Sequence, residues 1–308
     1  MLNRSNPYYR QVELVMRVLP LVAQEPRFAL KGGTAINLFV RDLPRLSVDI
    51  DLTYLPLDDR DTALPAIEDG VKRIAADVER VLVDTSVSAI PGEANYTQRL
   101  QVTAGGVSIK IEVSPVLRGS VLDASNTPVM DSVADQFGYV ETPVLSLEEL
   151  YAGKLVAALD RQHPRDLFDV MILLESNGIT SELMELFIVY LISSNRPIAE
   201  LLAPRLQPLQ GVFEQQFQGM SLHPVTVKQL QDTRITMIES LRHQLTDNHK
   251  RFLLSLKIGE PEWDLLKHAH AQELPAVLWK LQNLQRLTSK QREEAVSKLR
   301  KTLDDIPE

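Results

Sequence analysis

The stretch from Ser47 to Leu52 alternates strictly between apolar and polar residues. Successive side chains of an extended strand face opposite sides, so its aliphatic residues share one face and Asp49 and Asp51 share the other. This pattern predicts a half-buried strand with two acids on its open face. The apolar run Phe28 to Leu30 predicts a short buried strand before it.

A second alternating stretch predicts a hairpin. Arg99 to Thr103 and Val107 to Val113 flank Gly105-Gly106, a dipeptide suited to a tight turn. The aliphatic residues of the second arm point inward, which places Glu112 on the polar face together with Lys110. A strand signal of this clarity does not recur after about Val144.

Apolar residues recur at three and four positions through most of the remaining chain, as in amphipathic helices. The expected helices run from Tyr8 to Val22, Ala35 to Arg41 with Thr34 as cap, Leu64 to Val78, Ser146 (a capping box with Glu149) to Arg161, Pro164 to Ser176, Glu182 to Ser193, Thr226 to Leu245, Asn248 to Lys257, Glu262 to Ala271, and Ala276 to the C-terminus. The expected class is α+β: a mixed sheet with helices in a domain of residues 1–145, then an all-helical domain of residues 146–308.

Composition narrows the choice of function. The chain has no cysteine, which excludes disulfides, cysteine-ligated zinc and thiol nucleophiles. It shows no signal peptide and no apolar stretch long enough to span a bilayer, so a cytoplasmic protein is expected. A net charge of −8 argues against a broad nucleic-acid-coating face. The basic run from Lys280 to Lys301 fits either a solvated helix or a surface for a polyanion.

Two motifs suggest nucleotide chemistry. Gly32-Gly33-Thr34 follows a strand and precedes a helix, where glycines let the backbone approach phosphate oxygens, although such a turn alone is common. Asp49 and Asp51 lie roughly 7 Å apart on one strand face and could hold Mg²⁺, or Mn²⁺, with a substrate phosphate. A solvated strand edge would give the same spacing.

Two further features depend on tertiary contacts. Glu112 becomes a third carboxylate beside Asp49 and Asp51 if its strand is their neighbour, and three acids together favour a cation. Lys110 could instead pair with Glu112. Lys154 shares a helix face with Arg161, and Lys154 could offset the charge of a leaving pyrophosphate or belong to a surface salt-bridge network.

The order G-G-T, D-x-D and single acid resembles the DNA polymerase β-like nucleotidyltransferase superfamily. The stretches Lys31-Gly32-Gly33-Thr34-Ala35 and Arg45 to Leu52, with Lys154 and Arg165-Asp166-Leu167-Phe168-Asp169, more specifically resemble the AbiEii/AbiGii toxin family, which includes the MenT toxins. The chain departs from many superfamily members in carrying Thr34 where they have Ser, and in a longer gap between Gly33 and Asp49.

The resemblance implies a polymerase β-like fold in the N-terminal domain and transfer of a nucleoside monophosphate from an NTP to an acceptor. Asp49, Asp51 and Glu112 would hold the metal, and Glu112 would help to activate the acceptor hydroxyl. Gly32, Gly33, Thr34, Lys154 and Arg165 would contact the nucleotide, and Asp166 would be catalytic by motif. The family also implies a toxin that modifies RNA, most often the 3′ end of tRNA, and a cognate antitoxin.

Two other functions stay open at this point. An enzyme acting on a small hydroxylated acceptor such as a cationic aminoglycoside is expected to have an acidic acceptor cleft. Arg161, Arg165 and the basic run from Lys280 to Lys301 modestly favour RNA instead. A non-catalytic member would bind only a nucleotide or a partner, which the complete acidic set argues against. Trp263 and Trp279 are expected to be core residues, because they are embedded in apolar helix patterns.

Overall fold

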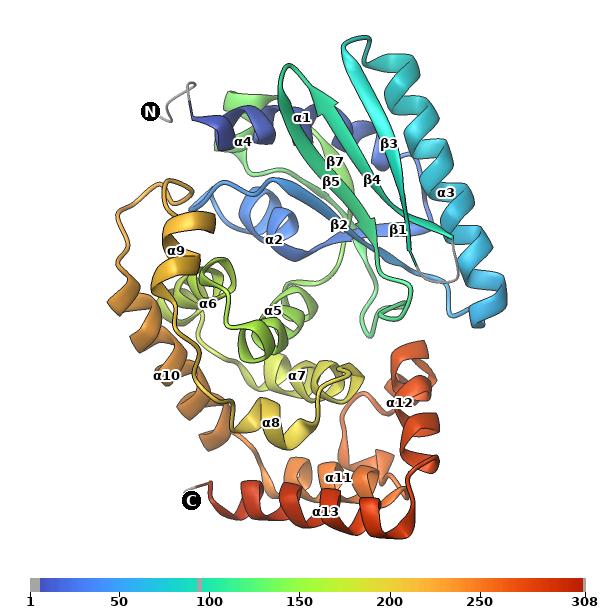
Figure 1. The fold of residues 1–308 in the computed structure, drawn as a ribbon, viewed down its shortest axis with the longest axis vertical. Coiled ribbons are helices and arrows are strands. Elements are labelled where there is room, and N and C mark those ends of the chain that lie inside the picture. The colour runs from blue at the N-terminus through green and yellow to red at the C-terminus, as the bar shows by residue number, and fades with distance from the viewer. Residues whose placement is uncertain (1–5, 93–95, 307–308) are drawn as a thin grey trace. The chain divides into compact units, whose positions relative to one another are not determined.

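The computed structural model describes residues 6–92 and 96–306 (Figure 1). The chain divides into two compact units, Met1–Leu150 with Gln218–Pro224, and Tyr151–Phe217 with Val225–Glu308. In the described residues the first unit contains every strand, and the second contains helices only. The expected α+β class is therefore confirmed.

The described part of the first unit forms a seven-stranded mixed sheet in the order β3-β4-β5-β2-β1-β7-β6. Its strands are β1 (Phe28–Lys31), β2 (Asp49–Tyr54), β3 (Thr85–Pro91), β4 (Thr97–Ala104), β5 (Val107–Val113), β6 (Ser125–Pro128) and β7 (Glu141–Val144). Strand β2 runs parallel to β5 and antiparallel to β1, so the two alternating stretches of the sequence are neighbours at the centre of the sheet.

Helices α1 (Pro7–Val22) and α3 (Arg60–Val81) pack against this sheet, as Figure 1 shows. Helix α3 covers the aliphatic face, because the Phe28 ring lies so close to Gly70 that a Cβ there would be 2.7 Å from it. Ile50 and Ile111 are almost completely buried on that face. Asp49 and Asp51, which flank Ile50, and Glu112, which follows Ile111, therefore lie on the opposite face. A third helix of this unit, α4 (Asp131–Phe137), contacts α1 through the rings of Phe137 and Tyr9.

The helix after β1 begins earlier than the sequence suggests. Residues Gly32–Thr34 form α2, which continues as the π-helical segment η1 (Ala35–Val40). Thr34 was expected to cap this helix, and that expectation is wrong, because Lys31 occupies the cap position. The glycines thus belong to the first turn itself.

One late segment of the chain returns to the first unit. Residues 218–224 lie along residues 44–46, with hydrogen bonds from Leu46 N to Met220 O (2.8 Å) and from Leu222 N to Pro44 O (3.0 Å). The side-chain amide of Asn6 donates to Gly219 O at 2.9 Å. The first unit is therefore discontinuous in sequence, a feature that periodicity does not predict.

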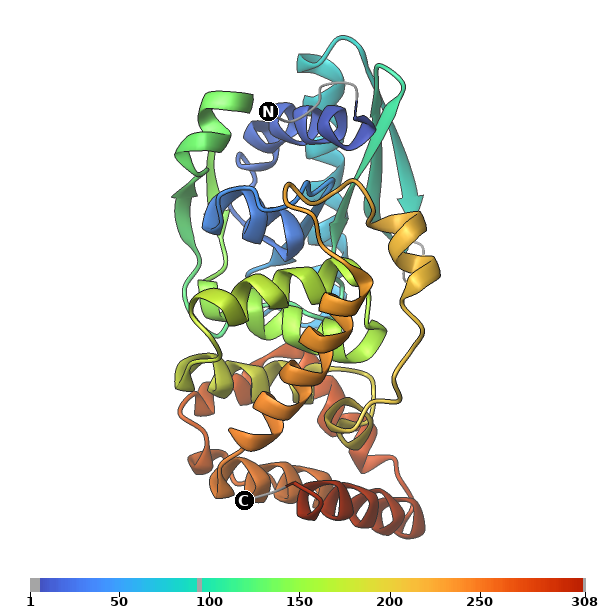
Figure 2. The same ribbon diagram turned by 90° about the vertical axis from the view of Figure 1, so that its left-hand side faces the viewer.

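The second unit is a set of helices (Figure 2). They are most of α5 (Leu147–Arg161), α6 (Pro164–Ser176), α7 (Ser181–Ser193), α8 (Ile198–Leu202), α9 (Gln210–Gln216), α10 (Val227–His243), α11 (Asp247–Ile258), η3 (Trp263–Leu265), η4 (Ala269–Glu273), α12 (Pro275–Gln285) and α13 (Ser289–Asp304). None of the described helices has the length and apolar content needed to cross a membrane.

Two helix predictions are wrong in this unit. The stretch Glu262 to Ala271 forms short 3₁₀ turns and no α-helix. The last predicted helix is in fact two helices, α12 and α13. A capping box starts α13: the backbone N–H of Gln291 donates to the Thr288 hydroxyl, and the backbone N–H of Thr288 donates to the Gln291 side chain. Trp279 was expected in the core, but its residue is 41% exposed.

Candidate active site

A row of charged residues crosses the centre of the sheet on the face away from α3. Lys31 of β1 lies opposite Asp51 of β2, and Asp51 lies beside Glu112 of β5. Arg99 of β4 completes the row opposite Glu112. Residues in register on neighbouring strands share a face and lie about 5 Å apart. The structure therefore brings Asp51 and Glu112 together, which was the condition for Glu112 to become a third carboxylate of the site.

Asp49 joins this row from two residues earlier on β2, in register with Lys110 of β5. Asp49 and Asp51 are both half-buried, whereas Ile50 between them is fully buried. Alternation along one strand thus fixes both carboxylates on one face, held by the packing of the opposite face. Hard carboxylate oxygens in such a pair are suitable ligands for Mg²⁺ together with a phosphate.

The glycine turn lies against these acids. Gly32 has a φ of +71°, and a Cβ on it would clash with the carboxylate of Asp51. A Cβ on Gly33 would lie 2.7 Å from the guanidinium of Arg45 and 2.9 Å from the Ser47 hydroxyl. Both positions therefore need glycine, and the backbone of the turn can lie close to the acidic row only because they lack side chains.

Thr34 has a structural role in this arrangement. Its hydroxyl donates to the carbonyl oxygen of Asp49 and lies 3.1 Å from the Ser47 hydroxyl, and the residue is fully buried. The sequence suggested that this hydroxyl faces a phosphate. In the structure it instead links the turn to the backbone of Asp49, and so to the strand that carries both aspartates.

Glu112 has a cationic neighbour of its own. Its Oε1 lies 2.8 Å from Nη2 of Arg99, whereas the sequence had suggested Lys110 as its partner. Among the described residues, no three His, Cys, Asp or Glu side chains are arranged to hold a metal ion. The residues present fit a metal held by Asp49 and Asp51, and Glu112 could become a third ligand only by turning away from Arg99.

Lys31 is a site residue that motif reasoning did not single out. Burial lowers the pKa of its ammonium group, and Asp51 and Glu112 oppose that shift by favouring the charged form. Its position next to the two glycines and in register with Asp51 was the available signal. Lys31 adds a cation to one end of the acidic pair, as Arg99 does at the other end.

The second unit holds a buried ion-pair network. Lys154 of α5 lies with its Nζ 2.8 Å from Asp166 Oδ1 and 3.0 Å from Asp169 Oδ2, both on α6. Arg161 contacts Asp166 at 2.5 Å and 3.0 Å. The side chains of Lys154, Asp166 and Asp169 are 7%, 1% and 1% exposed. The surface salt-bridge network considered from sequence is therefore wrong.

The charges of this network depend on one another. Burial alone would raise the pKa of Asp166, but Lys154 and Arg161 outweigh it and hold the pKa well below its ordinary value of 3.8. Asp166 is therefore ionised and fixes the direction of Lys154. Arg165 is half-buried in the first turn of α6, where its backbone amide donates to Nδ1 of His163 at 3.1 Å.

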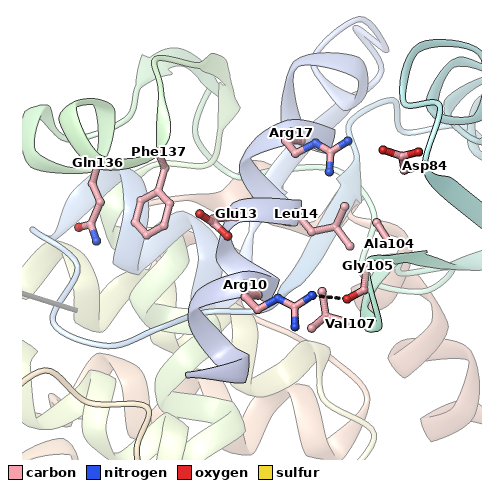
Figure 3. Close-up of a pocket in the computed structure, with 10 residues that line it drawn as sticks. All are labelled: Arg10, Glu13, Leu14, Arg17, Asp84, Ala104, Gly105, Val107, Gln136 and Phe137. Carbon is pink, nitrogen blue, oxygen red and sulfur yellow. Dashed lines mark hydrogen bonds between the residues drawn. The ribbon is translucent and has the colours of Figure 1, made fainter. Parts of the chain in front are cut away.

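A pocket of about 490 Å³ lies elsewhere in the first unit (Figure 3). Arg10, Glu13, Leu14 and Arg17 of α1 form one wall, and the β4–β5 turn, Asp84 and the end of α4 form the others. The Arg10 guanidinium donates to Gly105 O across its rim. None of the predicted site residues lines this pocket, and its two arginines and two acids give no net charge.

Comparison with known proteins agrees with these motifs. The model of the family described as "Nucleotidyl transferase AbiEii toxin, Type IV TA system" matches residues 13–283. The MenT4 nucleotidyltransferase toxin from Mycobacterium tuberculosis H37Rv has a similar structure, with a TM-score of 0.62, 15% sequence identity, and coverage of 90% of this chain and 93% of that one.

Terminal uridylyl transferase 4 from Trypanosoma brucei, solved with bound dUTP, aligns at a TM-score of 0.31 and 15% identity, over 96% of this chain and 92% of that one. No curated protein sequence matches the chain significantly. The family match spans most of the 308 residues and contains every predicted site residue. This chain therefore belongs to the AbiEii nucleotidyltransferase toxin family of type IV toxin–antitoxin systems.

Proposed function

We propose that this protein transfers a nucleoside monophosphate from an NTP to the 3′ end of a tRNA, and that this reaction makes it a toxin. The observation that carries the proposal is the position of Asp49, Asp51 and Glu112 on one face of two adjacent strands, beside a glycine turn. The reaction would take place in the cytoplasm, where NTPs and tRNA occur together.

Asp49 and Asp51 are the residues that would hold Mg²⁺, or Mn²⁺ in its place. The ion would neutralise the triphosphate and stabilise the charge that develops on it. Lys31 and Arg99 lie at the two ends of the row and limit the repulsion between its acids. Glu112 accepts the proton of the acceptor hydroxyl after its carboxylate has separated from Arg99. Glu112 therefore acts as a base only when substrate is bound.

The reaction is a displacement at the α-phosphorus. The acceptor oxygen forms the new P–O bond, the bond to the β-phosphate oxygen breaks, and pyrophosphate leaves with the electron pair. Gly32, Gly33 and the turn anchored by Thr34 bind the outer phosphates through backbone N–H groups. Lys154 and Arg165 supply positive charge for the departing pyrophosphate, and Asp166 acts by positioning Lys154.

The RNA acceptor and the antitoxin are proposed from family membership. An antitoxin encoded with the toxin would prevent transfer in the uninduced cell. Specificity for a tRNA end over a small hydroxylated acceptor is supported by the basic residues of the second unit.

Incubation of the purified protein with each α-³²P-labelled NTP, Mg²⁺ and total cellular RNA tests the proposal. We expect label on tRNA-sized RNA with one or more NTPs, and no label with the Asp49→Ala variant. Nuclease mapping should place the added nucleotide at the 3′ end. Label on a small molecule would show that the acceptor is not RNA. Nucleotide binding without transfer, for all four NTPs, would show that the protein binds nucleotides and is not a transferase.

A further inference from the structure

Three lysines of the second unit lie on three different helices. Lys257 lies in the last turn of α11, Lys280 lies in α12 and Lys298 lies in α13. Helix α12 packs on α7, and α13 packs on both α8 and α11. Lys280 contacts the backbone just after α7, and Lys298 pairs with a carboxylate of α8, so both lysines face the α7–α8 segment.

Lys280 is the most constrained of the three. Its Nζ donates to Ser194 O at 2.6 Å and lies 3.4 Å from Arg196 O, at the C-terminal end of α7. Burial, and then the charge of Lys257, lower its pKa to about 8. Burial and the charge of Lys298 lower the pKa of Lys257. The ammonium group of Lys257 is therefore close enough to those of Lys280 and Lys298 to repel them.

Two carboxylates pair with cations of this region. Glu200 pairs with Lys298 at 2.8 Å, and Asp160 pairs with Arg196. The three lysines and Arg196, taken with these two acids, carry two net positive charges. Like charges held together by packing are costly in isolation, and a bound anion relieves that cost.

Helix α12 also carries an exposed aromatic ring. Trp279, next to Lys280 in sequence, is 41% exposed, and Leu278 is 46% exposed. The guanidinium of Arg286 lies 5.7 Å from the centre of the Trp279 ring. Helix α12 contains no Asp or Glu. An exposed tryptophan with a guanidinium over its ring can stack on a base, and cations of the same unit can contact the phosphates of the RNA backbone.

We propose that Lys257, Lys280, Lys298, Trp279 and Arg286 form a binding surface for single-stranded RNA, which we name the α12 surface. The inference rests on the proposed function, because it assigns a contact to the RNA acceptor. The three lysines bind phosphate oxygens, and Trp279 and Arg286 hold an unpaired base. A protein partner would not require several mutually repelling ammonium groups that an anion can satisfy.

RNA affinity without NTP or Mg²⁺ tests this surface in the full-length protein. Filter binding of a labelled tRNA and of its single-stranded 3′ segment should show weaker binding by Trp279→Ala, by about 5-fold or more, which is the lower range for the loss of one base stack. Lys257→Gln should reduce the slope of log affinity against log salt by about 0.7, as for one lost phosphate contact.

Matched controls separate the surface from general charge and from folding. Lys228→Gln removes an exposed lysine of α10 that pairs with Asp232, and Tyr139→Ala removes an exposed ring of the first unit. Both should leave RNA affinity unchanged. Arg286→Gln serves as a second variant should Trp279→Ala unfold, as judged by circular dichroism and melting temperature.

The outcomes distinguish this inference from the proposed function. Equal RNA affinity of the wild type and the α12-surface variants would overturn the surface while leaving nucleotide transfer intact. Loss of antitoxin binding by these variants, with RNA affinity retained, would assign the surface to a protein and also overturn the inference. If the wild-type protein transferred no nucleotide to RNA, the proposed function itself would be wrong.

Discussion

Asp51 of β2 and Glu112 of β5 are direct neighbours on parallel strands, and each faces a cation on its outer side. Lys31 lies opposite Asp51, and Arg99 lies opposite Glu112. The acidic pair is therefore balanced by side chains that a divalent ion and its triphosphate could displace. This row, more than any single motif, relates the fold to nucleotide transfer.

Asp51→Asn should lower nucleotide transfer by at least about 100-fold, because loss of one preorganised charged group commonly has an effect of that size. Incorporation of α-labelled NTP into RNA measures it. Glu79→Gln, which alters an exposed acid of α3, is the matched control and should keep full activity. Full activity in Asp51→Asn would remove Asp51 from the metal site.

Gly32→Ala should lower both stability and transfer, since the new methyl group meets the Asp51 carboxylate. Gly106→Ala is an informative control: its φ is +82°, but the space around it is open. Both variants lose about 1–2 kcal/mol for a left-handed backbone. Urea unfolding should show the larger loss for Gly32→Ala, and only Gly32→Ala should lose activity.

Arg99→Gln should change the unfolding free energy by less than about 1 kcal/mol, because its pair with Glu112 is largely exposed. It should also lower the Mg²⁺ concentration that gives half-maximal transfer, since Glu112 is then able to turn toward the aspartates. Arg80→Gln, which breaks the exposed pair with Asp77 on α3, should leave the Mg²⁺ requirement unchanged. A higher Mg²⁺ requirement in Arg99→Gln would contradict the exchange of partners proposed for Glu112.

Lys154→Met should lower the unfolding free energy by about 3–5 kcal/mol, because Asp166 and Asp169 would stay buried without their shared cation. Chemical denaturation measures the loss. The triple variant Lys154→Met, Asp166→Asn, Asp169→Asn should recover part of the stability and none of the transfer activity. A stability loss in Lys154→Met no larger than that of an exposed lysine variant would contradict the network.

Asp166 should also give the protein an acid-sensitive stability. Its pKa in the folded state is below the ordinary 3.8, so its stabilising effect is fully present above that pH and is lost as pH falls below it toward the folded pKa. Unfolding curves between pH 2.5 and 6 should therefore show a steeper loss at the acid end for the wild type than for Asp166→Asn. Parallel curves would show that Lys154 and Arg161 do not lower the pKa of Asp166.

Sequence patterns predicted the local geometry of the site well. Strict alternation placed Asp49 and Asp51 on one face, and the two-residue turn at Gly105-Gly106 fixed the register that sets Arg99 opposite Glu112. The parallel pairing of β2 with β5 could not follow from local patterns, because it joins strands more than fifty residues apart. The placement of Glu112 beside Asp51 is therefore a result of the structure.

Other features had weak sequence signals. Strand β6, Ser-Asn-Thr-Pro, is short and polar, and it forms because β7 supplies its partners. The helical periodicity of Glu262 to Ala271 was misleading, since its apolar residues bury without forming an α-helix. The contact of Thr34 with Asp49 and the buried ion pairs of Lys154 also could not be predicted from the sequence, because they depend on tertiary packing. The domain limits at residues 145 and 146 and the individual catalytic roles stay predictions.

The strand-like contact between residues 44–46 and residues 218–224 bears on how this toxin is made. The first unit receives its last segment only after more than two thirds of the polypeptide has been synthesised. A nascent chain that has emerged only as far as the acidic strands lacks the backbone partners of Leu46, three residues before Asp49. Asp49 and Asp51 are therefore synthesised well before the segment whose backbone fastens the chain just ahead of them.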